Sequence, residues 1–284
     1  MAGTIEQLTF AEYRARPGLN ASTIAKGRTS MLHMRHEATR TRDHRTAAMR
    51  WGTLIHSIVL EPVEFAKLAK IIDTPSKRHG EWLRAVEDHG DFAITPTEHA
   101  KLIEIKGRIH GNRIAQHWLS ETTHEASLFW DEPLIGPCKA RLDAVAELFG
   151  LWDLKSTGQI EMRQFGNTSA RLGYHVKLGW YRRAFRAVFG KEPPQIGVLV
   201  FEADEPYDVV PLPVSIGDVA AGEEIAVRIA LEYADCCERG EWPGVYRPGL
   251  TLNFPDYIAE ELDGNEAPEW DGTEEEPEWM KGND

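Results

Sequence analysis

Two carboxylates and a lysine, Asp143, Asp153 and Lys155, are the residues of this 284-residue sequence that most clearly point to chemistry. They lie in two apolar-rich segments on either side of a turn predicted at 149–150, which is typical of a β-hairpin. Because side chains alternate between the faces of a strand, Asp153 and Lys155 point the same way, and Asp143 can reach that face. Carboxylates are the hard oxygen ligands that Mg²⁺ prefers. Such a metal could polarise a phosphodiester and activate water that the lysine orients.

An isolated Asp-x-Lys also has a simpler interpretation, because the tripeptide is common. Lys155 could form a cross-strand salt bridge with an aspartate and have no further role. The strand residues around Asp153 and Lys155 are apolar, so both would be half-buried polar groups, which need a partner or a function. The context must decide between the two interpretations.

The elements that would position these residues predict an α/β fold. Near the N-terminus, residues 19–23 indicate a helix start with Asn20 or Ser22 as the N-cap. Apolar spacing of three and four residues predicts a helix over 46–60, and residues 63–120 are mostly helical, with loops near 75–80 and 90–96. The pattern then changes to strands over 124–130, 138–148, 151–157, 197–203 and 207–214, with helices over 171–189 and 216–239. This order predicts a central mixed β-sheet flanked by helices after a mainly helical N-terminal part.

The composition is that of a globular protein, with 42% hydrophobic and 27% charged residues. The chain has no apolar run of about 18 residues, so we expect no transmembrane helix and no membrane partner. The N-terminus lacks the pattern of a secretory signal, and three cysteines are too few for a disulfide framework, so we expect a cytoplasmic setting. The cysteine count also excludes a four-cysteine zinc or iron–sulfur site, and the chain has no ATP-binding P-loop motif.

The net charge of −13 argues at first against binding nucleic acid, but the charge is unevenly distributed. Residues 256–284 carry 12 acids and one base, which predicts an acidic, flexible tail, whereas the rest of the chain holds 33 acids and 31 bases. Two segments, 1–50 and 160–191, are basic, with nine bases to four acids and seven bases to one acid. We therefore expect one domain over 1–255 (1–120 mainly helical, 121–255 with the sheet and C-terminal helix) followed by the tail.

Short motifs lie in a fixed order along residues 13–255. They are Trp51-Gly52-Thr53-Leu54-Ile55-His56, Leu60-Glu61-Pro62, Glu125-Ala126-Ser127, Arg141-Leu142-Asp143, Asp153-Leu154-Lys155-Ser156-Thr157, Gly173-Tyr174-His175, Tyr181 and Trp242-Pro243-Gly244. Together they resemble the RecE-type (exonuclease VIII) branch of the PD-(D/E)XK nucleases, with phage lambda exonuclease as a more distant relative. The resemblance implies a restriction-endonuclease-like core with a central mixed β-sheet.

The resemblance also implies roles for residues of the site. Asp143 and Asp153 match the two acidic metal ligands of the family, and Lys155 matches its catalytic lysine. The backbone carbonyl of Leu154 would be a further ligand, and His56 matches a helix histidine that binds metal. The implied cofactor is Mg²⁺, with Mn²⁺ as a possible substitute.

Other matches concern catalysis and DNA binding. Glu125 matches an acidic residue that supports the metal site, and Ser22 resembles a small residue that contacts the 5′-phosphate. The sequence departs from the family at Leu142, where proline is usual, and at Lys177, where the motif that ends at Tyr181 usually has glutamine. The residues expected to bind DNA are Ser22, Arg141, Tyr174, Lys177, Tyr181 and Arg182, several of them on the basic helix expected over 171–189, because Lys and Arg contacts to phosphate dominate non-specific affinity.

The activity that the resemblance implies is 5′→3′ exonuclease action on one strand of linear double-stranded DNA, leaving 3′ single strands for recombination by annealing. It also implies a ring-shaped homo-oligomer, a single-strand annealing protein as partner, and a phage or prophage gene in a bacterial host cell. Two alternatives stay open, a structure-specific endonuclease or resolvase of the same superfamily and a non-catalytic DNA-binding recombination protein.

Overall fold

The computed structural model describes residues 3–40, 46–74, 76–247 and 251. The chain divides into a compact unit, Met1–Gly244, and a second unit, Val245–Asp284. The acidic tail expected over 256–284 lies outside the described residues.

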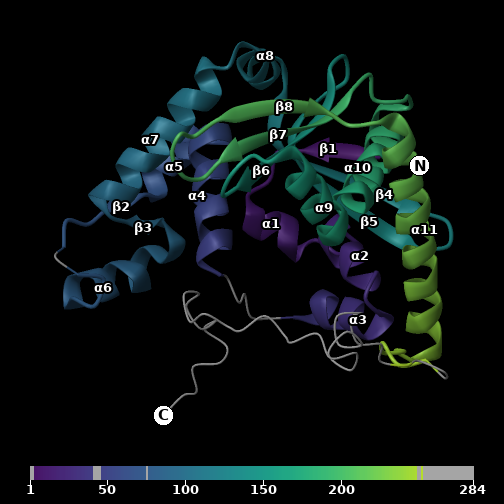
Figure 1. Ribbon diagram of the computed structural model, residues 1–284. Coiled ribbons are helices and arrows are strands. Elements are labelled where there is room, and N and C mark those ends of the chain that lie inside the picture. Colours follow the sequence, from purple (N-terminus) through teal and green to yellow (C-terminus); the bar gives the residue numbers. More distant parts are fainter. Residues whose placement is uncertain (1–2, 41–45, 75, 248–250, 252–284) are drawn as a thin grey trace, which may run out of the picture. The chain divides into compact units, whose positions relative to one another are not determined.

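A six-stranded mixed sheet forms the centre of the first unit (Figure 1). Its strands, in spatial order, are β1 (Thr4–Glu6), β4 (Thr123–Glu132), β5 (Gly136–Ala146), β6 (Gly150–Thr157), β7 (Ile196–Glu202) and β8 (Val209–Pro213). Neighbouring strands are antiparallel except β6 and β7. Parallel strands need a long crossover, and two helices supply it here, α9 (Met162–Leu172) and α10 (Tyr174–Phe189).

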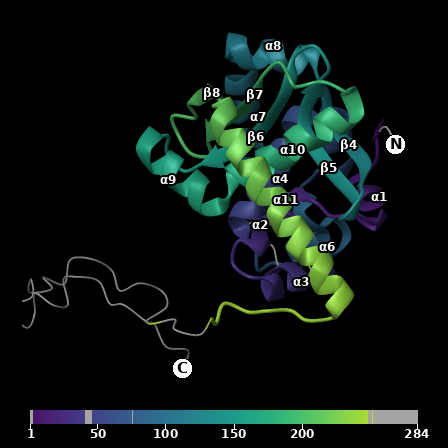
Figure 2. The same ribbon diagram turned by 90° about the vertical axis from the view of Figure 1, so that its right-hand side faces the viewer.

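Helices cover both faces of this sheet, and each face has its own hydrophobic core. One core packs the sheet against α2 (Ala21–Gly27), α3 (Met31–Thr39), α10 and α11 (Ile216–Arg239), and Figure 2 shows α11 crossing in front of α10. The other core packs the sheet against α4 (Ala47–Leu60), α5 (Pro62–Leu68), α7 (Pro96–Gly111) and α8 (Arg113–Glu121). A short helix, α1 (Phe10–Ala15), follows β1.

A small lobe lies between α5 and α7 in the chain. It contains α6 (Gly80–His89), a 3₁₀ turn η1 (Gly90–Phe92), and a two-stranded parallel sheet of β2 (Lys70–Ile71) and β3 (Ala93–Ile94). Trp82 and Ala85 of α6 pack with Ile72 and Ala93 in a core of their own. This small core is separate from the two larger ones, and Ile94 of β3 connects the lobe to the core that contains α4.

The predicted fold class is confirmed: the protein is α/β, with a central mixed sheet flanked by helices. The helices expected over 46–60 and 216–239 agree with α4 and α11, and Asn20 is the N-cap of α2. In the described part of the chain, no helix has the length and apolar character needed to cross a membrane.

Two predicted elements need correction, and one short strand was not predicted. The helix expected over 171–189 is two helices, because Gly173 ends α9 in the left-handed conformation with φ 74°. The loop expected near 90–96 holds η1 and β3 instead, and β1 was not predicted at all. Both short strands, of two and three residues, lack the length at which alternation becomes a readable signal.

Candidate active site

The hairpin of β5 and β6 brings Asp143 next to the strand that carries Asp153 and Lys155. Ala144 pairs with Trp152 across the hairpin, and the Leu154 N–H donates a hydrogen bond of 2.7 Å to Asp143 Oδ2. Gly150 makes the tight turn possible, because its φ is 93° and a side chain there would collide with the Gln195 backbone. The short connection thus fixes the Asp143 carboxylate against β6.

Three side chains from three elements form a candidate metal site. His56 of α4, Glu125 of β4 and Asp143 of β5 each offer one ligand atom, and these atoms lie within 4.8 Å of one another. His56 Nδ1 lies 3.6 Å from Asp143 Oδ1. Residues separated by almost seventy positions in the chain, His56 and Glu125, therefore converge on the carboxylate that the sequence motif identified.

Glu125 occupies a special backbone conformation. The β4–β5 ladder pairs His124 with Ala144 and Ala126 with Leu142, and Glu125 between them has a φ of 50°. A non-glycine residue in this left-handed region costs free energy and persists only where its surroundings hold it, most often at functional sites. Arg141 supplies that hold, because its Nε donates a 2.5 Å hydrogen bond to Glu125 Oε2.

Arg141 was expected to bind DNA, and the structure shows that its Nε and Nη1 donate to protein groups. Besides Glu125, its guanidinium donates to the Leu8 carbonyl at 2.7 Å and to Ser127 Oγ at 3.3 Å, and its side chain is 9% exposed. Arg141 lines the cleft wall and supports Glu125, and its Nη2 lies 3.8 Å from Glu61 Oε1, so its contact with DNA stays a prediction.

Asp153 and Lys155 form a second group beside the metal triplet. Asp153 is buried, and its carboxylate forms an ion pair with the Lys155 ammonium. Lys155 Nζ also donates to the Leu154 carbonyl at 2.9 Å, the group expected to bind metal, and lies 5.4 Å from the centre of the Tyr174 ring. The simpler interpretation expected a salt bridge across the hairpin, whereas the observed ion pair lies within β6, next to a set of metal-ligand side chains.

The charges of the triplet depend strongly on one another. Burial raises the pKa of Asp143, but His56, Lys155 and the Leu154 N–H overcome this effect and lower that pKa to about 2. Burial and the Asp143 carboxylate raise the pKa of Glu125 to about 7, although Arg141 opposes the change. Burial lowers the pKa of His56, but the Asp143 carboxylate more than offsets it, so the net shift is upward. The site thus attracts cations and holds protons near neutral pH.

The second group is also shifted by its environment. Burial raises the pKa of Asp153, and the neighbouring Asp143 adds to this effect while Lys155 opposes it. Burial lowers the pKa of Lys155, but Asp153 and Asp143 reverse this and keep the lysine protonated. A protonated Lys155 can donate to water or to a phosphate oxygen but cannot accept a proton from them.

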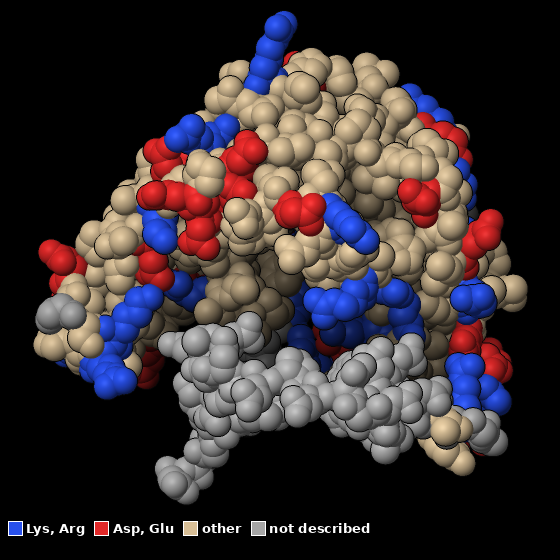
Figure 3. Space-filling model, viewed as in Figure 1, with Lys and Arg blue, Asp and Glu red and all other residues tan. Residues whose placement is uncertain are grey.

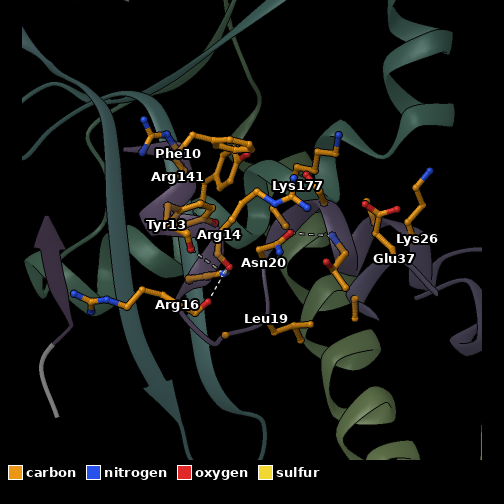
Figure 4. A pocket seen from close by; sticks show the side chains of 18 of the residues that line it. Phe10, Tyr13, Arg14, Arg16, Leu19, Asn20, Lys26, Glu37, Arg141 and Lys177 are labelled. Atoms are coloured by element: carbon orange, nitrogen blue, oxygen red, sulfur yellow. Dashed lines mark hydrogen bonds between the residues drawn. The ribbon is translucent and has the colours of Figure 1, made fainter. Parts of the chain in front are cut away.

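A cleft of about 2240 Å³ opens beside both groups. Its lining includes His56, Glu125, Asp143 and Lys155, together with side chains from α1, α2 and α10. Figure 4 shows Arg14 of α1, Lys26 of α2 and Lys177 of α10 directed into the same space. Of the residues expected to bind DNA, Ser22, Tyr174, Lys177 and Tyr181 line this cleft.

Arg182 does not belong to this cleft, which corrects the prediction for this residue. Positions 174, 177 and 181 of α10 face the cleft, whereas Arg182 lines a different pocket and forms ion pairs with Glu192 and Glu223, both at 2.8 Å. Successive residues of a helix point about 100° apart, so Arg182 cannot share the direction of Tyr181. Helix α10 is therefore basic on two sides: one side faces the cleft, and the other pairs with Glu192 and Glu223.

The donor set fits the expected metal. One imidazole nitrogen and two carboxylate oxygens lie within 4.8 Å of one another, and oxygen-rich sites with an imidazole suit Mg²⁺ or Mn²⁺ better than thiolate-binding metals. Asp153 and the Leu154 carbonyl stand beside the triplet but are held by Lys155. His56, Glu125 and Asp143 are therefore the residues best placed to hold a metal, and Asp153 and Leu154 remain predicted ligands.

Some cleft residues were missed by the sequence analysis. Lys26 of α2 and Arg28, which caps its C-terminal end, line the cleft, and so does Tyr13 of α1. The centres of the Tyr13 and Phe129 rings are 6.1 Å apart. A signal was present for α2, because residues 21–28 hold two bases and no acid. No such signal existed for Tyr13, whose place depends on the docking of α1 against the sheet.

No family model and no curated protein sequence matches this chain. Among solved structures, the chain is similar to a protein from Eubacterium rectale named as a putative exonuclease, with a TM-score of 0.60 and 12% sequence identity. The match covers 92% of this chain and 100% of the other. It shows that the two chains share their fold over nearly their whole length.

Proposed function

We propose that the protein is a Mg²⁺-dependent exodeoxyribonuclease that degrades one strand of linear double-stranded DNA in the 5′→3′ direction. The observation that carries this proposal is the convergence of His56, Glu125 and Asp143 beside the Asp153–Lys155 pair, at one wall of a cleft lined by cations. The name of the similar Eubacterium rectale protein and the motif resemblance agree with it.

Each residue of the site has a distinct part in the proposed reaction. His56, Glu125 and Asp143 would hold the metal, which supplies a Lewis acid and a water of lowered pKa when bound. Lys155 stays protonated beside Asp153, so it can orient the attacking water and offset the charge that develops on the phosphodiester. Arg141 keeps Glu125 in place by its short hydrogen bond.

The cleft residues would hold the DNA end. Ser22 lies at the start of α2 on the cleft wall, which suits the proposed contact with a 5′-phosphate, and Lys177 and Tyr181 project from α10 on the same cleft. The products would be 3′ single strands for a single-strand annealing protein, and a ring-shaped homo-oligomer around the DNA would prevent its sideways escape. These last two features rest on the family resemblance.

A digest of several DNA forms tests the proposal. Linear duplexes with 5′-phosphate or 5′-hydroxyl ends, and covalently closed circles, are incubated with Mg²⁺, Ca²⁺ or EDTA. We expect Mg²⁺ to support nucleotide release from the phosphorylated linear duplex, slower release from the 5′-hydroxyl duplex, and no cutting of closed circles. EDTA should abolish release.

Other outcomes would contradict specific parts of the proposal. Nicking of closed circles would replace the exonuclease by an endonuclease with the same chemistry. Binding without any release would favour a non-catalytic recombination protein. Release from the 3′ end would reverse the proposed polarity, and equal rates on both 5′ ends would remove the proposed contact between Ser22 and the 5′-phosphate.

A further inference from the structure

Helix α9 follows the strand that carries Lys155 and is unusually exposed. Not one of its 11 residues is buried, and Glu161 precedes it as the N-cap. Between Met162 and Leu172 it contains two arginines and no acidic residue. Arg163, Asn167 and Arg171 are spaced four residues apart and all exposed, so they form one polar, basic stripe along the helix.

The inner side of α9 rests on the candidate active site. Phe165 packs against the Tyr174 ring at 6.4 Å in an edge-on arrangement, and the same ring lies over Lys155. Gly173 turns the chain between the two helices, and a side chain there would meet the Arg28 guanidinium at 2.7 Å. The outer stripe therefore has a fixed place relative to the site.

Helix α2 continues this basic surface. Arg28 Nη1 donates a 3.0 Å hydrogen bond to the Arg171 carbonyl at the end of α9, and Lys26, two residues before Arg28, also lines the cleft. Lys26, Arg28, Arg163 and Arg171 form no ion pair with any described residue. Figure 3 shows Lys and Arg side chains gathered around α2 and the lower end of α9, beside a hollow in the surface.

We infer that these four residues, the α2–α9 ridge, bind the backbone phosphates of the duplex DNA that leads to the active site. Arg171 lines the cleft and Arg163 lies eight residues further along α9, about 12 Å away at a helical rise of 1.5 Å per residue. Successive phosphates of one strand are about 3.4 Å apart along the DNA axis, so the ridge reaches three to four nucleotides beyond the cleft.

The charge pattern of the α2–α9 ridge favours duplex DNA as its ligand. Double-stranded DNA presents an array of negative charge, and a surface whose four cations form no ion pair with described residues matches a polyanion of any sequence. The inference rests on the proposed function, since it assigns the substrate of that site a second contact. The inference predicts that the ridge contributes to the affinity for the duplex and not to the chemistry performed by His56, Glu125 and Asp143.

The test uses the full chain and a 30-base-pair, 5′-phosphorylated duplex in Ca²⁺. The dissociation constant of the protein–duplex complex is measured at several salt concentrations for the wild type and for the double variant Arg163→Gln/Arg171→Gln. A matched double variant, Arg108→Gln/Arg239→Gln, removes two exposed arginines that form ion pairs on other helices. Thermal unfolding of all three proteins checks that they are folded.

Loss of two phosphate contacts makes the negative slope of log association constant against log salt concentration shallower by about 1.8. This corresponds to about a 60-fold weaker affinity at 0.1 M salt. We expect this change in the Arg163/Arg171 variant alone. An unchanged slope, or the same decrease in the Arg108/Arg239 variant, would overturn the inference. Absence of salt-dependent binding by the wild type would instead contradict the proposed function, and the inference would fail with it.

Discussion

The two sides of helix α10 place cations in opposite surroundings. The side toward α11 carries three arginines in ion pairs with three glutamates: Arg182, Arg183 and Arg186 with Glu132, Glu192 and Glu223. On the cleft side, Lys177 lies 5.6 Å from the Tyr174 ring, which also contacts Lys155. Among the described residues, Lys177 has no acid within ion-pair distance.

This difference separates cations that stabilise the fold from cations that are available to a ligand. Glu223 is buried and accepts hydrogen bonds from all three arginines, so the network ties α10 to α11. Burial and the neighbouring Lys155 lower the pKa of Lys177, which is the mark of a cation held without a counter-charge. A phosphate group would supply that counter-charge.

Of the two sides of α10, the paired side has the larger expected effect. Glu223→Gln leaves three arginines without their central carboxylate, and breaking a buried ion pair from one side typically costs about 3 kcal/mol. The free energy of unfolding, measured in urea, should fall by roughly this amount. The adjacent and exposed Glu224→Gln serves as the control and should change stability little. Equal stability of the two variants would mean that the network contributes nothing.

Part of this contrast could be read from the sequence. Alternation and the turn at Gly150 predicted the hairpin that places Asp143 beside β6, and helical spacing predicted α4 and α11. The charge of 160–191 predicted a basic region but not which cations are neutralised, because Glu132 and Glu223 come from distant parts of the chain.

The support of Glu125 was also beyond sequence reasoning. Arg141 is part of a recognisable motif, yet its hydrogen bond to Glu125 depends on the β4–β5 register and on the left-handed backbone at Glu125. Such a conformation has no marker in the sequence when the residue is not glycine. The motifs therefore named the residues that the fold brings together, His56, Glu125 and Asp143, whereas the partners that hold them required the fold.

The carboxylates of the two regions should respond differently to pH. Burial raises the pKa of Glu132, but the Arg183 guanidinium more than offsets this, so the net shift of that pKa is downward and the carboxylate stays ionised. Glu125 has its pKa raised to about 7, so below that pH it carries a proton that a metal must displace. Mn²⁺ affinity should therefore fall about tenfold from pH 8 to pH 6 for Glu125 alone, and further as His56 is protonated. A pH-independent Mn²⁺ affinity, measured by paramagnetic resonance, would contradict the assignment.

On the cleft side, Lys177→Gln should affect binding rather than stability. Removal of one phosphate contact weakens duplex binding about eightfold at 0.1 M salt, with a decrease of about 0.9 in the salt slope. The folded-state pKa of Lys177 is lowered, so its charge opposes folding below its unfolded pKa, and the variant should be at least as stable as the wild type. Loss of stability with unchanged DNA affinity would place Lys177 with the structural cations.

The smallest expected effect concerns the acidic tail. Deletion of residues 256–284 removes 12 acids and one base. Nuclease activity should persist. Duplex affinity should rise a few-fold at low salt, because the deletion removes the electrostatic repulsion between the tail and DNA. The rise should be smaller at 0.1 M salt, where charges more than about 10 Å apart are screened. Loss of activity on this deletion would show that the tail is needed by the fold or the site.

The central claim is that the convergence of His56, Glu125 and Asp143 is the metal-dependent nuclease site. The most direct test is nucleotide release from a 5′-phosphorylated linear duplex with Mg²⁺ by the wild type, by Asp143→Asn and by the surface control Asp235→Asn. The account predicts release by the wild type and the control, and a decrease of at least about 1000-fold for Asp143→Asn, or roughly 4 kcal/mol in the barrier. Release by Asp143→Asn at the wild-type rate would contradict it.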